Sequence, residues 1–353
     1  MNVPYCRLVW LGCLLAVVVF SGCQAAPMRV PHKWTSVPTG TKSSLRGLCA
    51  VDAQVAFASG SGGTLLRTLD GGKTWTDIAP PDTEGCDFRD VEAFDRNHVI
   101  AMVAGQPARV YRTADSGLTW QIVHSDERPA AFFDAMAFAG QYGVMFGDAI
   151  DGQFCLLESS DAGRTWQDRS GLMLPAPLSG EAAFAASGTC LVAFDGASKN
   201  FSLVTGGGPC RVVKLGPEVV GSNTKNYWSR TLPLQNGGSS KGAFSIAWNG
   251  ELGVAVGGDY ANPDVHKASG AISSDGGDTW SVVDAGGFRS AVVWFDAKSL
   301  LAVGSDGASW SFDSGRNWNP FGNIGFHALS KAADGSVWAS GSNGRVARLM
   351  PRD

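Results

Sequence analysis

Short apolar stretches alternate with glycine-rich and polar turns along the chain from about residue 33 onward. The first stretches cover residues 45–51, 55–58, 64–67 and 75–78, and each has the length of one β-strand. Strand-length apolar runs separated by turn residues predict antiparallel strands joined by tight turns. A similar series of runs begins near residues 88, 132, 181, 243 and 289. Repeated four-stranded units predict an all-β fold, a β-propeller in which each unit forms one blade.

A short motif, Ser/Thr-x-Asp-x-Gly-x-Thr/Asn-Trp, occurs five times in register with these units. Aspartate in a tight turn accepts hydrogen bonds from backbone N–H groups, glycine adopts a positive φ, and tryptophan starts the next strand with a large apolar surface. A catalytic site needs one acid at a defined place, so five copies favour a structural role. We interpret the motif as the hairpin between the third and fourth strands of a blade. Its aspartates are Asp70, Asp115, Asp161, Asp275 and Asp313.

The spacing of the motif indicates the number of blades. Successive motif aspartates are 45, 46, 114 and 38 residues apart, and the gap of 114 residues has room for two units. The additional unit, blade four, is degenerate: we place its last corner at residues 205–208 and an insertion at about residues 210–226. After Trp318 the chain has room for three more strands, and residues 33–37 supply a fourth. The sequence thus predicts a seven-bladed β-propeller over residues 33–353, closed by pairing of the N-terminal strand with the C-terminal blade.

These repeats resemble the BNR/Asp-box propellers of the photosystem II stability/assembly factor-like family, in a bacterial form. Besides the five Asp-boxes, the resemblance rests on phrases such as Phe-Arg-Asp-Val-Glu-Ala-Phe at residues 88–94 and Gly-Gly-Asp-Tyr at residues 257–260. It implies a scaffold that binds another protein during the assembly of that protein, with no established chemistry of its own. Some relatives carry the label oxidoreductase, but Gly60-x-Gly62 lacks the third glycine and the acidic residue of a dinucleotide site. We expect no cofactor.

The first 22 residues have the pattern of a bacterial lipoprotein signal peptide. Arg7 precedes a 13-residue apolar run that is too short to span a bilayer, and two small residues then precede Cys23. This phrase resembles the lipobox, so we expect lipidation of Cys23 and a short tether over residues 23–32. The alternative is ordinary signal cleavage at Ala25-Ala26. Acyl chains would hold the exported protein on the bacterial envelope, where we favour the periplasmic face of the outer membrane.

Five cysteines remain in the expected propeller, and an odd number cannot form a complete set of disulfides. We interpret most of them as buried small apolar side chains, with one conceivable bridge between Cys190 and Cys210. No Cys or His spacing fits a metal site. The five are Cys49, Cys86, Cys155, Cys190 and Cys210.

One end of the predicted channel collects polar residues from several blades. In a four-stranded meander, the start of the innermost strand and the hairpin between the second and third strands lie at the same end. Arginine there suits a bidentate grip on a carboxylate, so we expect a protein partner or an acidic ligand at this face. The alternative is a ring of ion pairs that only closes the channel. The candidates are Arg46, Arg89, Asp90, Asp134, Glu181, Arg289 and His327 from strand starts, and Asp148, Asp259 and Tyr260 from hairpins.

An enzyme remains the second hypothesis. Sialidases and other glycoside hydrolases also carry Asp-boxes, and a hydrolase or lyase of this kind would use Glu181, Asp90 and Tyr260. The count of seven blades and the absence of the sialidase phrase Phe-Arg-Ile-Pro tell against it. A net charge of -4 disfavours nucleic acid as a partner. We therefore favour a non-enzymatic binding or assembly scaffold.

Overall fold

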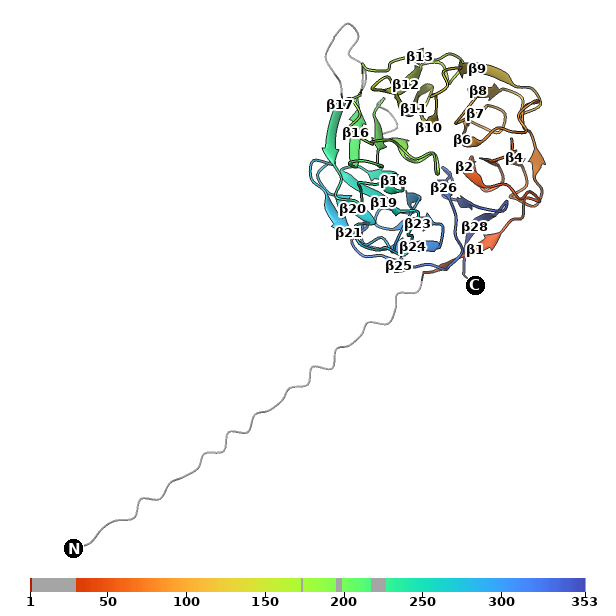
Figure 1. The fold of residues 1–353 in the computed structure, drawn as a ribbon. Helices are drawn as coiled ribbons and strands as arrows, with labels where there is room; N and C mark the ends of the chain where they lie inside the picture. Colours follow the sequence, from red (N-terminus) through yellow and green to blue (C-terminus); the bar gives the residue numbers. More distant parts are fainter. Residues whose placement is uncertain (2–29, 173, 195–198, 217–226, 353) are drawn as a thin grey trace.

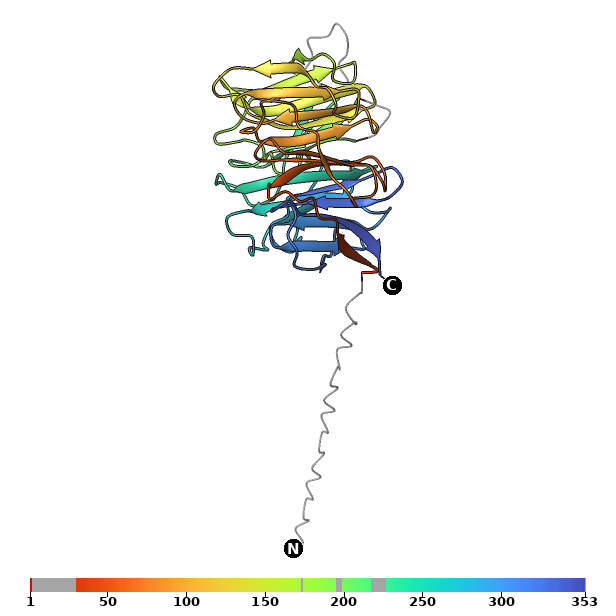
Figure 2. The same cartoon turned by 90° about the vertical axis from the view of Figure 1, so that its right-hand side faces the viewer.

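The computed structural model describes residues 1, 30–172, 174–194, 199–216 and 227–352. Its strands form seven four-stranded antiparallel sheets, and Figure 1 shows them arranged as blades around a central axis. Figure 2 shows the same ring edge-on. This architecture confirms the predicted fold class, an all-β seven-bladed propeller. Within the described ranges, no helix is long and apolar enough to cross a membrane.

The first three blades follow the repeat closely. Blade one contains β2 (Leu45–Ala50), β3 (Ala56–Gly60), β4 (Leu65–Thr68) and β5 (Thr76–Asp77). Blade two contains β6 (Phe88–Ala93), β7 (Val99–Val103), β8 (Ala108–Thr113) and β9 (Gln121–Asp126). Blade three contains β10 (Phe133–Ala139), β11 (Tyr142–Ile150), β12 (Gln153–Ser159) and β13 (Gln167–Asp168).

The remaining blades complete the ring. Blade four contains β14 (Leu191–Ala193), β15 (Phe201–Val204), β16 (Arg211–Leu215) and β17 (Tyr227–Thr231). Blade five contains β18 (Lys241–Asn249), β19 (Leu252–Asp259), β20 (Gly270–Ser273) and β21 (Ser281–Val283). Blade six contains β22 (Ala291–Trp294), β23 (Leu300–Gly304), β24 (Gly307–Ser311) and β25 (Asn319–Pro320). Blade seven contains β26 (Ala328–Lys331), β27 (Val337–Ser340), β28 (Val346–Pro351) and β1 (His32–Ser36).

The N-terminal strand closes the ring as predicted. β1 pairs antiparallel with β28 over five residues, and both lie at the edge of the ring where the described chain begins and ends (Figure 1). The ring of Trp34 packs against Phe326, with centroids 5.0 Å apart. The strand begins at His32, one residue before the predicted boundary, and Val30 is already buried in the core of this blade. The expected signal peptide, Cys23 and most of the tether lie outside the described residues.

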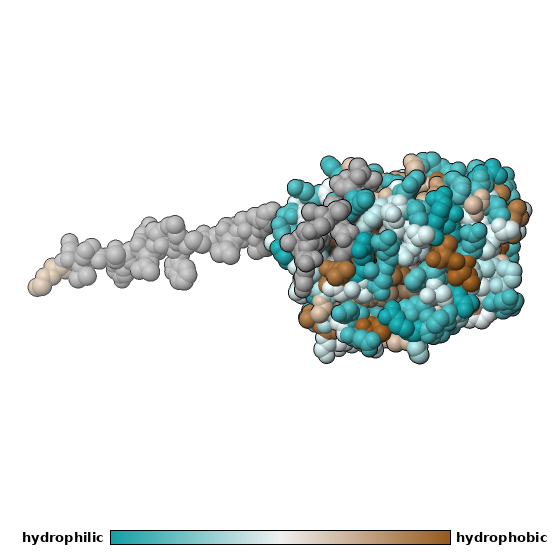
Figure 3. All heavy atoms as spheres, turned by 90° about the horizontal axis from the view of Figure 1, so that it is seen from above, coloured by the Kyte–Doolittle hydropathy of each residue, from teal (hydrophilic) through white to brown (hydrophobic). Residues whose placement is uncertain are grey.

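Most of the apolar core lies between neighbouring blades, because a blade buries both faces of its sheet against the adjacent ones. One cluster joins Leu45 and Leu66 of blade one to Trp338 and Val346 of blade seven. The edge of the ring that Figure 3 shows is mostly hydrophilic, with small separate hydrophobic patches. All five cysteines of the propeller are free, so the bridge conceived between Cys190 and Cys210 is not formed.

Each Asp-box uses its carboxylate within its own turn. In blade two, Thr113 Oγ1 donates to Asp115 Oδ1 over 2.7 Å, and the backbone and side chain of Thr119 donate to the same carboxylate over 2.9 and 2.6 Å. These hydrogen bonds lower the pKa of Asp115 to about 2. Gly117 has φ +86°, and a Cβ there would lie 2.8 Å from Ile78 of blade one. The turn therefore also sets the distance to the preceding blade.

Asp115→Ala is expected to lower the melting temperature by a few degrees at pH 7, because the turn loses its acceptor. The folded-state pKa lies below the unfolded value of 3.8, so the carboxylate contributes stability above about pH 4 and loses it as the pH falls toward 2. The difference between variant and parent should shrink over that range in thermal unfolding. An equal difference at pH 7 and pH 2 would show that charge in the turn is unimportant.

Blade four departs from the sequence interpretation. Residues 205–208 form the hairpin between β15 and β16, not the last corner, and the predicted insertion contains the strand β16. A glycine-rich corner without Asp or Trp fits either hairpin, so the motif gave no means of telling them apart. The rest of the predicted insertion, residues 217–226, lies outside the described residues.

A lysine takes part in the contact between blades four and five. Lys214 Nζ lies 4.0 Å from the ring centroid of Trp248 and 4.6 Å from that of Phe194, and it donates to the Gly276 carbonyl over 2.6 Å. An ammonium against aromatic faces is attracted by the ring electrons. This contact joins β16 to the Asp-box turn of blade five. Blade four itself has no Asp-box.

Candidate functional site

A β-bulge near the start of the innermost strand recurs around the ring. In blades one, two, three and five, the pairing of the first two strands skips one residue. A bulged residue is unpaired, and its side chain is re-aimed relative to the strand. Ser290 and His327 directly precede the first paired residue in blades six and seven and take the corresponding place. The bulged residues are Arg46, Arg89, Asp134 and Phe244.

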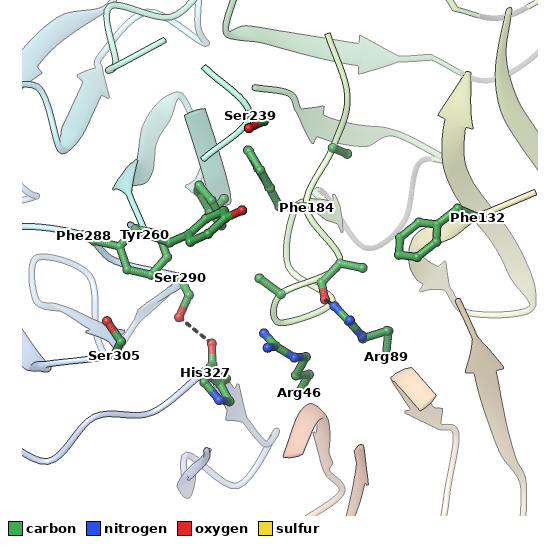
Figure 4. A pocket seen from close by; sticks show the side chains of 14 residues that line it. Arg46, Arg89, Phe132, Phe184, Ser239, Tyr260, Phe288, Ser290, Ser305 and His327 are labelled. Atoms are coloured by element: carbon green, nitrogen blue, oxygen red, sulfur yellow. Dashed lines mark hydrogen bonds between the residues drawn. The ribbon is translucent and has the colours of Figure 1, made fainter. Parts of the chain in front are cut away.

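Five of these six positions line one cavity of about 510 Å³ at the mouth of the channel. Arginine and histidine come from blades one, two and seven. Aromatic rings come from blades three, five and six and from the segment that precedes β14 of blade four. Figure 4 shows the two arginines on one side of the cavity and Phe184, Tyr260 and Phe288 on another. The remaining lining residues are Phe132, Ala183, Ala185, Ala186, Ser239, Phe244, Ser290, Ser305 and His327.

The guanidinium of Arg46 makes no hydrogen bond or ion pair with any residue that the structure describes. Burial lowers the pKa of Arg46, and the neighbouring charge of Arg89 lowers it further, while Asp87 opposes both effects. Arg46 is half-buried, and a partly desolvated cation without a partner is stabilised when an anion neutralises it. Arg46 is therefore the group in this cavity best suited to bind a carboxylate.

Arg89 and His327 line the same cavity but are held by the protein. Arg89 Nε donates to Asp87 over 2.6 Å, and its Nη1 donates to the carbonyl of Ala185 over 2.8 Å. Arg89 thus fixes the segment that carries Phe184 across the mouth. Burial lowers the pKa of His327 to about 4, with further lowering from Arg46, so this ring is neutral at pH 7. The positive charge of the cavity comes from the two arginines.

The aromatic side chains form a continuous wall. Phe184 and Phe244 are stacked with centroids 3.8 Å apart, and Phe288 meets Phe244 edge-on at 4.8 Å. Tyr260 completes the wall at 6.2 Å from Phe244, with 52% of its surface exposed at the rim. The site combines an apolar wall with two cations. Ligand-binding pockets often have such a mostly apolar lining with a few polar or charged groups.

The three residues named for a possible hydrolase do not come together at this cavity. Glu181 is fully buried, where it receives two hydrogen bonds from Arg211, over 2.8 and 2.6 Å, and one from Thr205 over 2.6 Å. Asp90 accepts hydrogen bonds from the backbone of Val91 and Met136, which joins blade two to blade three. Burial raises the pKa of Asp90 in spite of these hydrogen bonds. Neither carboxyl lines the cavity, and only Tyr260 does.

Three further candidates do not line the cavity either. Arg289 is 5% exposed and binds Asp306 over 2.9 Å. Asp259 caps its hairpin by accepting hydrogen bonds from Ala261 and Asn262. Asp134 is completely buried beside the channel, and neither of its oxygens has a hydrogen-bond partner among the described residues. Of the predicted binding residues, the cavity thus brings together Arg46, Arg89, Tyr260 and His327.

The phenylalanines that line the cavity were not among the sequence candidates. Phe244 occupies the bulge position that Arg46 and Arg89 occupy in their blades, so alignment of the repeats could have identified it. Phe184 lies in an irregular segment outside the repeat, and no sequence signal places it at the mouth.

Comparison with known proteins supports the same resemblance. The family model described as photosynthesis system II assembly factor YCF48 matches residues 26–167. No curated protein matches the sequence.

Solved structures share the fold at low sequence identity. A structure titled "YCF48 bound to D1 peptide" has a TM-score of 0.67 and 15% identity and covers 93% of this chain and all of that chain. YCF48 from Cyanidioschyzon merolae has a TM-score of 0.64 and 16% identity, with coverage of 91% and 100%. A streptogramin B lyase also aligns, with a TM-score of 0.59, 10% identity and coverage of 91% and 98%, so the fold alone does not separate binding proteins from enzymes. The family match and the seven blades together confirm that the chain is a propeller similar to the photosystem II assembly factors.

Proposed function

We propose that this protein is a non-enzymatic binding or assembly scaffold that binds an acidic segment of a protein partner at the channel mouth. The observation that carries the proposal is the guanidinium of Arg46, which lines the cavity without a partner among the described residues. A rigid ring with one such cation is preorganised for a carboxylate, because little order is lost when the ligand binds.

The assembly-factor resemblance supports a protein as the partner. One structure of similar fold is of YCF48 bound to a D1 peptide, and that binding is a property of YCF48. The proposal transfers to this chain the binding of a protein segment and leaves the identity of the segment open to experiment.

The site geometry argues against the hydrolase alternative. General acid catalysis needs an acid within hydrogen-bond reach of the bond that breaks. Glu181 is fully buried and bound to Arg211, and Asp90 is bound to two backbone amides away from the cavity. With neither carboxyl at the cavity, Tyr260 has no acidic partner from this set.

Arg46→Ala is expected to reduce the recovery of crosslinked partners at least about ten-fold, because a charge-assisted hydrogen bond contributes about 1.5–3 kcal/mol. The measurement is crosslinking in cells, followed by quantification of the proteins recovered with parent and variant. Arg230→Ala is the matched control, since Arg230 is exposed on the outer strand β17 and pairs with Asp278. A folded Arg46→Ala protein that recovers the same partners would contradict the proposal.

We also propose that lipidation of Cys23 anchors the protein to the bacterial envelope. The support is the signal-like sequence before Cys23. Cys23→Ser should move the protein from the membrane fraction to the soluble fraction of the periplasm, as measured by fractionation and immunoblotting. A parent protein that is never recovered with membranes would refute the anchor.

A further inference from the structure

The aromatic wall of the cavity faces the same space as the arginines. Binding of a carboxylate by the arginines does not require this apolar surface. Phe184, Tyr260 and Phe288 come from different segments and converge on this mouth (Figure 4). The half-exposed ring of Tyr260 stands at the rim, where water meets apolar surface. Apolar surface that a ligand removes from water contributes about 25 cal/mol per Å². The wall therefore favours a ligand that is apolar next to its anionic group.

Acidic side chains are absent from the described lining of the cavity. Its polar groups are the two arginines, the neutral ring of His327, and the hydroxyls of serines and Tyr260. A free amino group next to the carboxylate would find cations and no counter-ion here. The cavity thus disfavours a free amino acid and suits a carboxylate whose neighbouring nitrogen is an amide.

We propose that the partner segment presents its carboxylate directly beside an apolar, preferably aromatic, side chain. The carboxylate binds Arg46, and the side chain packs against the wall formed by Phe184, Tyr260 and Phe288. Ser239 and Ser305 at the cavity are placed to meet the polar backbone of such a segment. This inference rests on the proposed function, because it specifies the ligand of the same site.

The test measures the binding of small probes to the whole exported propeller by calorimetry or NMR titration. N-acetylphenylalanine carries all the proposed features, whereas N-acetylglycine lacks the side chain. N-acetylphenylalanine amide lacks the carboxylate, and phenylalanine has a free amino group. We expect N-acetylphenylalanine to bind at least about ten-fold more tightly than each of the other three. No binding of N-acetylphenylalanine at about 10 mM overturns the inference.

Variants separate the apolar contact from the charge. Tyr260→Ala should weaken N-acetylphenylalanine about three- to ten-fold and leave N-acetylglycine unchanged, since one aromatic pair contributes about 0.5–1.5 kcal/mol. Tyr260→Phe should bind like the parent, because the ring makes the contact. Val282→Ala, at an exposed position of the outer strand β21, is the control and should change neither probe. Equal loss of both probes in Tyr260→Ala would overturn the role of the wall.

The source of the carboxylate is distinguished with two peptides of equal composition. One ends in phenylalanine with a free terminal carboxylate, and the other has an internal Asp-Phe pair and an amidated end. Each peptide is compared with a counterpart in which serine replaces the phenylalanine. Tighter binding of the phenylalanine peptide supports the inference, and the peptide that shows it identifies the carboxylate as terminal or as an Asp side chain. If N-acetylglycine binds as tightly as N-acetylphenylalanine while Arg46→Ala still loses its partners, the inference about the wall is wrong and the proposed function still holds.

Discussion

Removal of residues 24–36 is expected to lower the free energy of unfolding by roughly 5 kcal/mol or more and to cause self-association. The deletion removes β1, which pairs with β28 from His32↔Pro351 to Ser36↔Ala347. It also removes the buried side chain of Val30 and the ring of Trp34. Each large apolar side chain contributes about 1.5–3 kcal/mol when buried, and each hydrogen bond adds about 1 kcal/mol.

The second consequence concerns the edge of the sheet. Without β1, β28 has unpaired N–H and C=O groups facing solvent, and such an edge pairs readily with another chain. Urea unfolding reports the loss of stability, and size-exclusion chromatography reports the association. Deletion of residues 24–29 only is the matched control and should unfold like the parent. A synthetic peptide of residues 30–40 should restore stability by taking the place of the strand.

An unchanged unfolding midpoint and a monomer after the longer deletion would contradict the closing role of β1. The ring would then be held by contacts between blades one and seven alone, such as the cluster around Trp338.

Asp134→Asn is expected to stabilise the protein increasingly as the pH rises above about 4. Asp134 is fully buried, and burial together with the neighbouring Asp148 raises the pKa of its carboxyl well above the ordinary 3.8. The unfolded chain releases this proton near pH 4, whereas the folded protein retains it. Between those two pKa values, each pH unit therefore costs the parent about 1.4 kcal/mol of stability, and the amide removes that cost.

The gain of the Asn variant over the parent is expected to increase from pH 5 to pH 7, because burial raises the pKa of the Asp134 carboxyl. Urea unfolding at several pH values measures it. Asp134→Leu extends the test, because neither oxygen of Asp134 has a hydrogen-bond partner among the described residues. The Asp134→Leu variant should be at least as stable as the Asp134→Asn variant if no polar contact is lost. Asp264→Asn, at an exposed site, is the control, and parallel curves for Asp134→Asn and parent would contradict the buried neutral carboxyl.

The fold was predictable from the sequence because its repeat is local. Each Asp-box forms its hydrogen bonds within about seven residues, so the same letters produce the same turn in every blade that has them. Blade four lacks the motif, and there the position of the strands could not be read. Residues 182–186 look like a strand, yet β14 begins only at Leu191. The sequence therefore predicts Glu181 at the start of a strand, whereas the strand begins ten residues later.

The site was predictable only in part, because a bulge reverses the side on which later residues point. Arg46 and Arg89 are the extra residues of their strands and face the cavity. Asp90 follows the bulge directly, so its side chain turns to the backbone of Met136 in the next blade. An alternating pattern does not reveal a bulge, and a shift of one residue exchanges the two faces of a strand.

The bulge positions also separate what the propeller recognises from what makes it fold. A bulged residue is unpaired in its strand, so its side chain can change while the register on either side is kept. The Asp-box turns lie at the other end of the blades from the cavity, and their own hydrogen bonds constrain them. Descendants of one ancestral ring can therefore acquire different specificities by single substitutions at bulge positions such as Arg46 and Phe244 while the strand register is kept. Of the six bulged or corresponding positions, the five that line the cavity offer a compact set for library selection of new binders on an unchanged backbone.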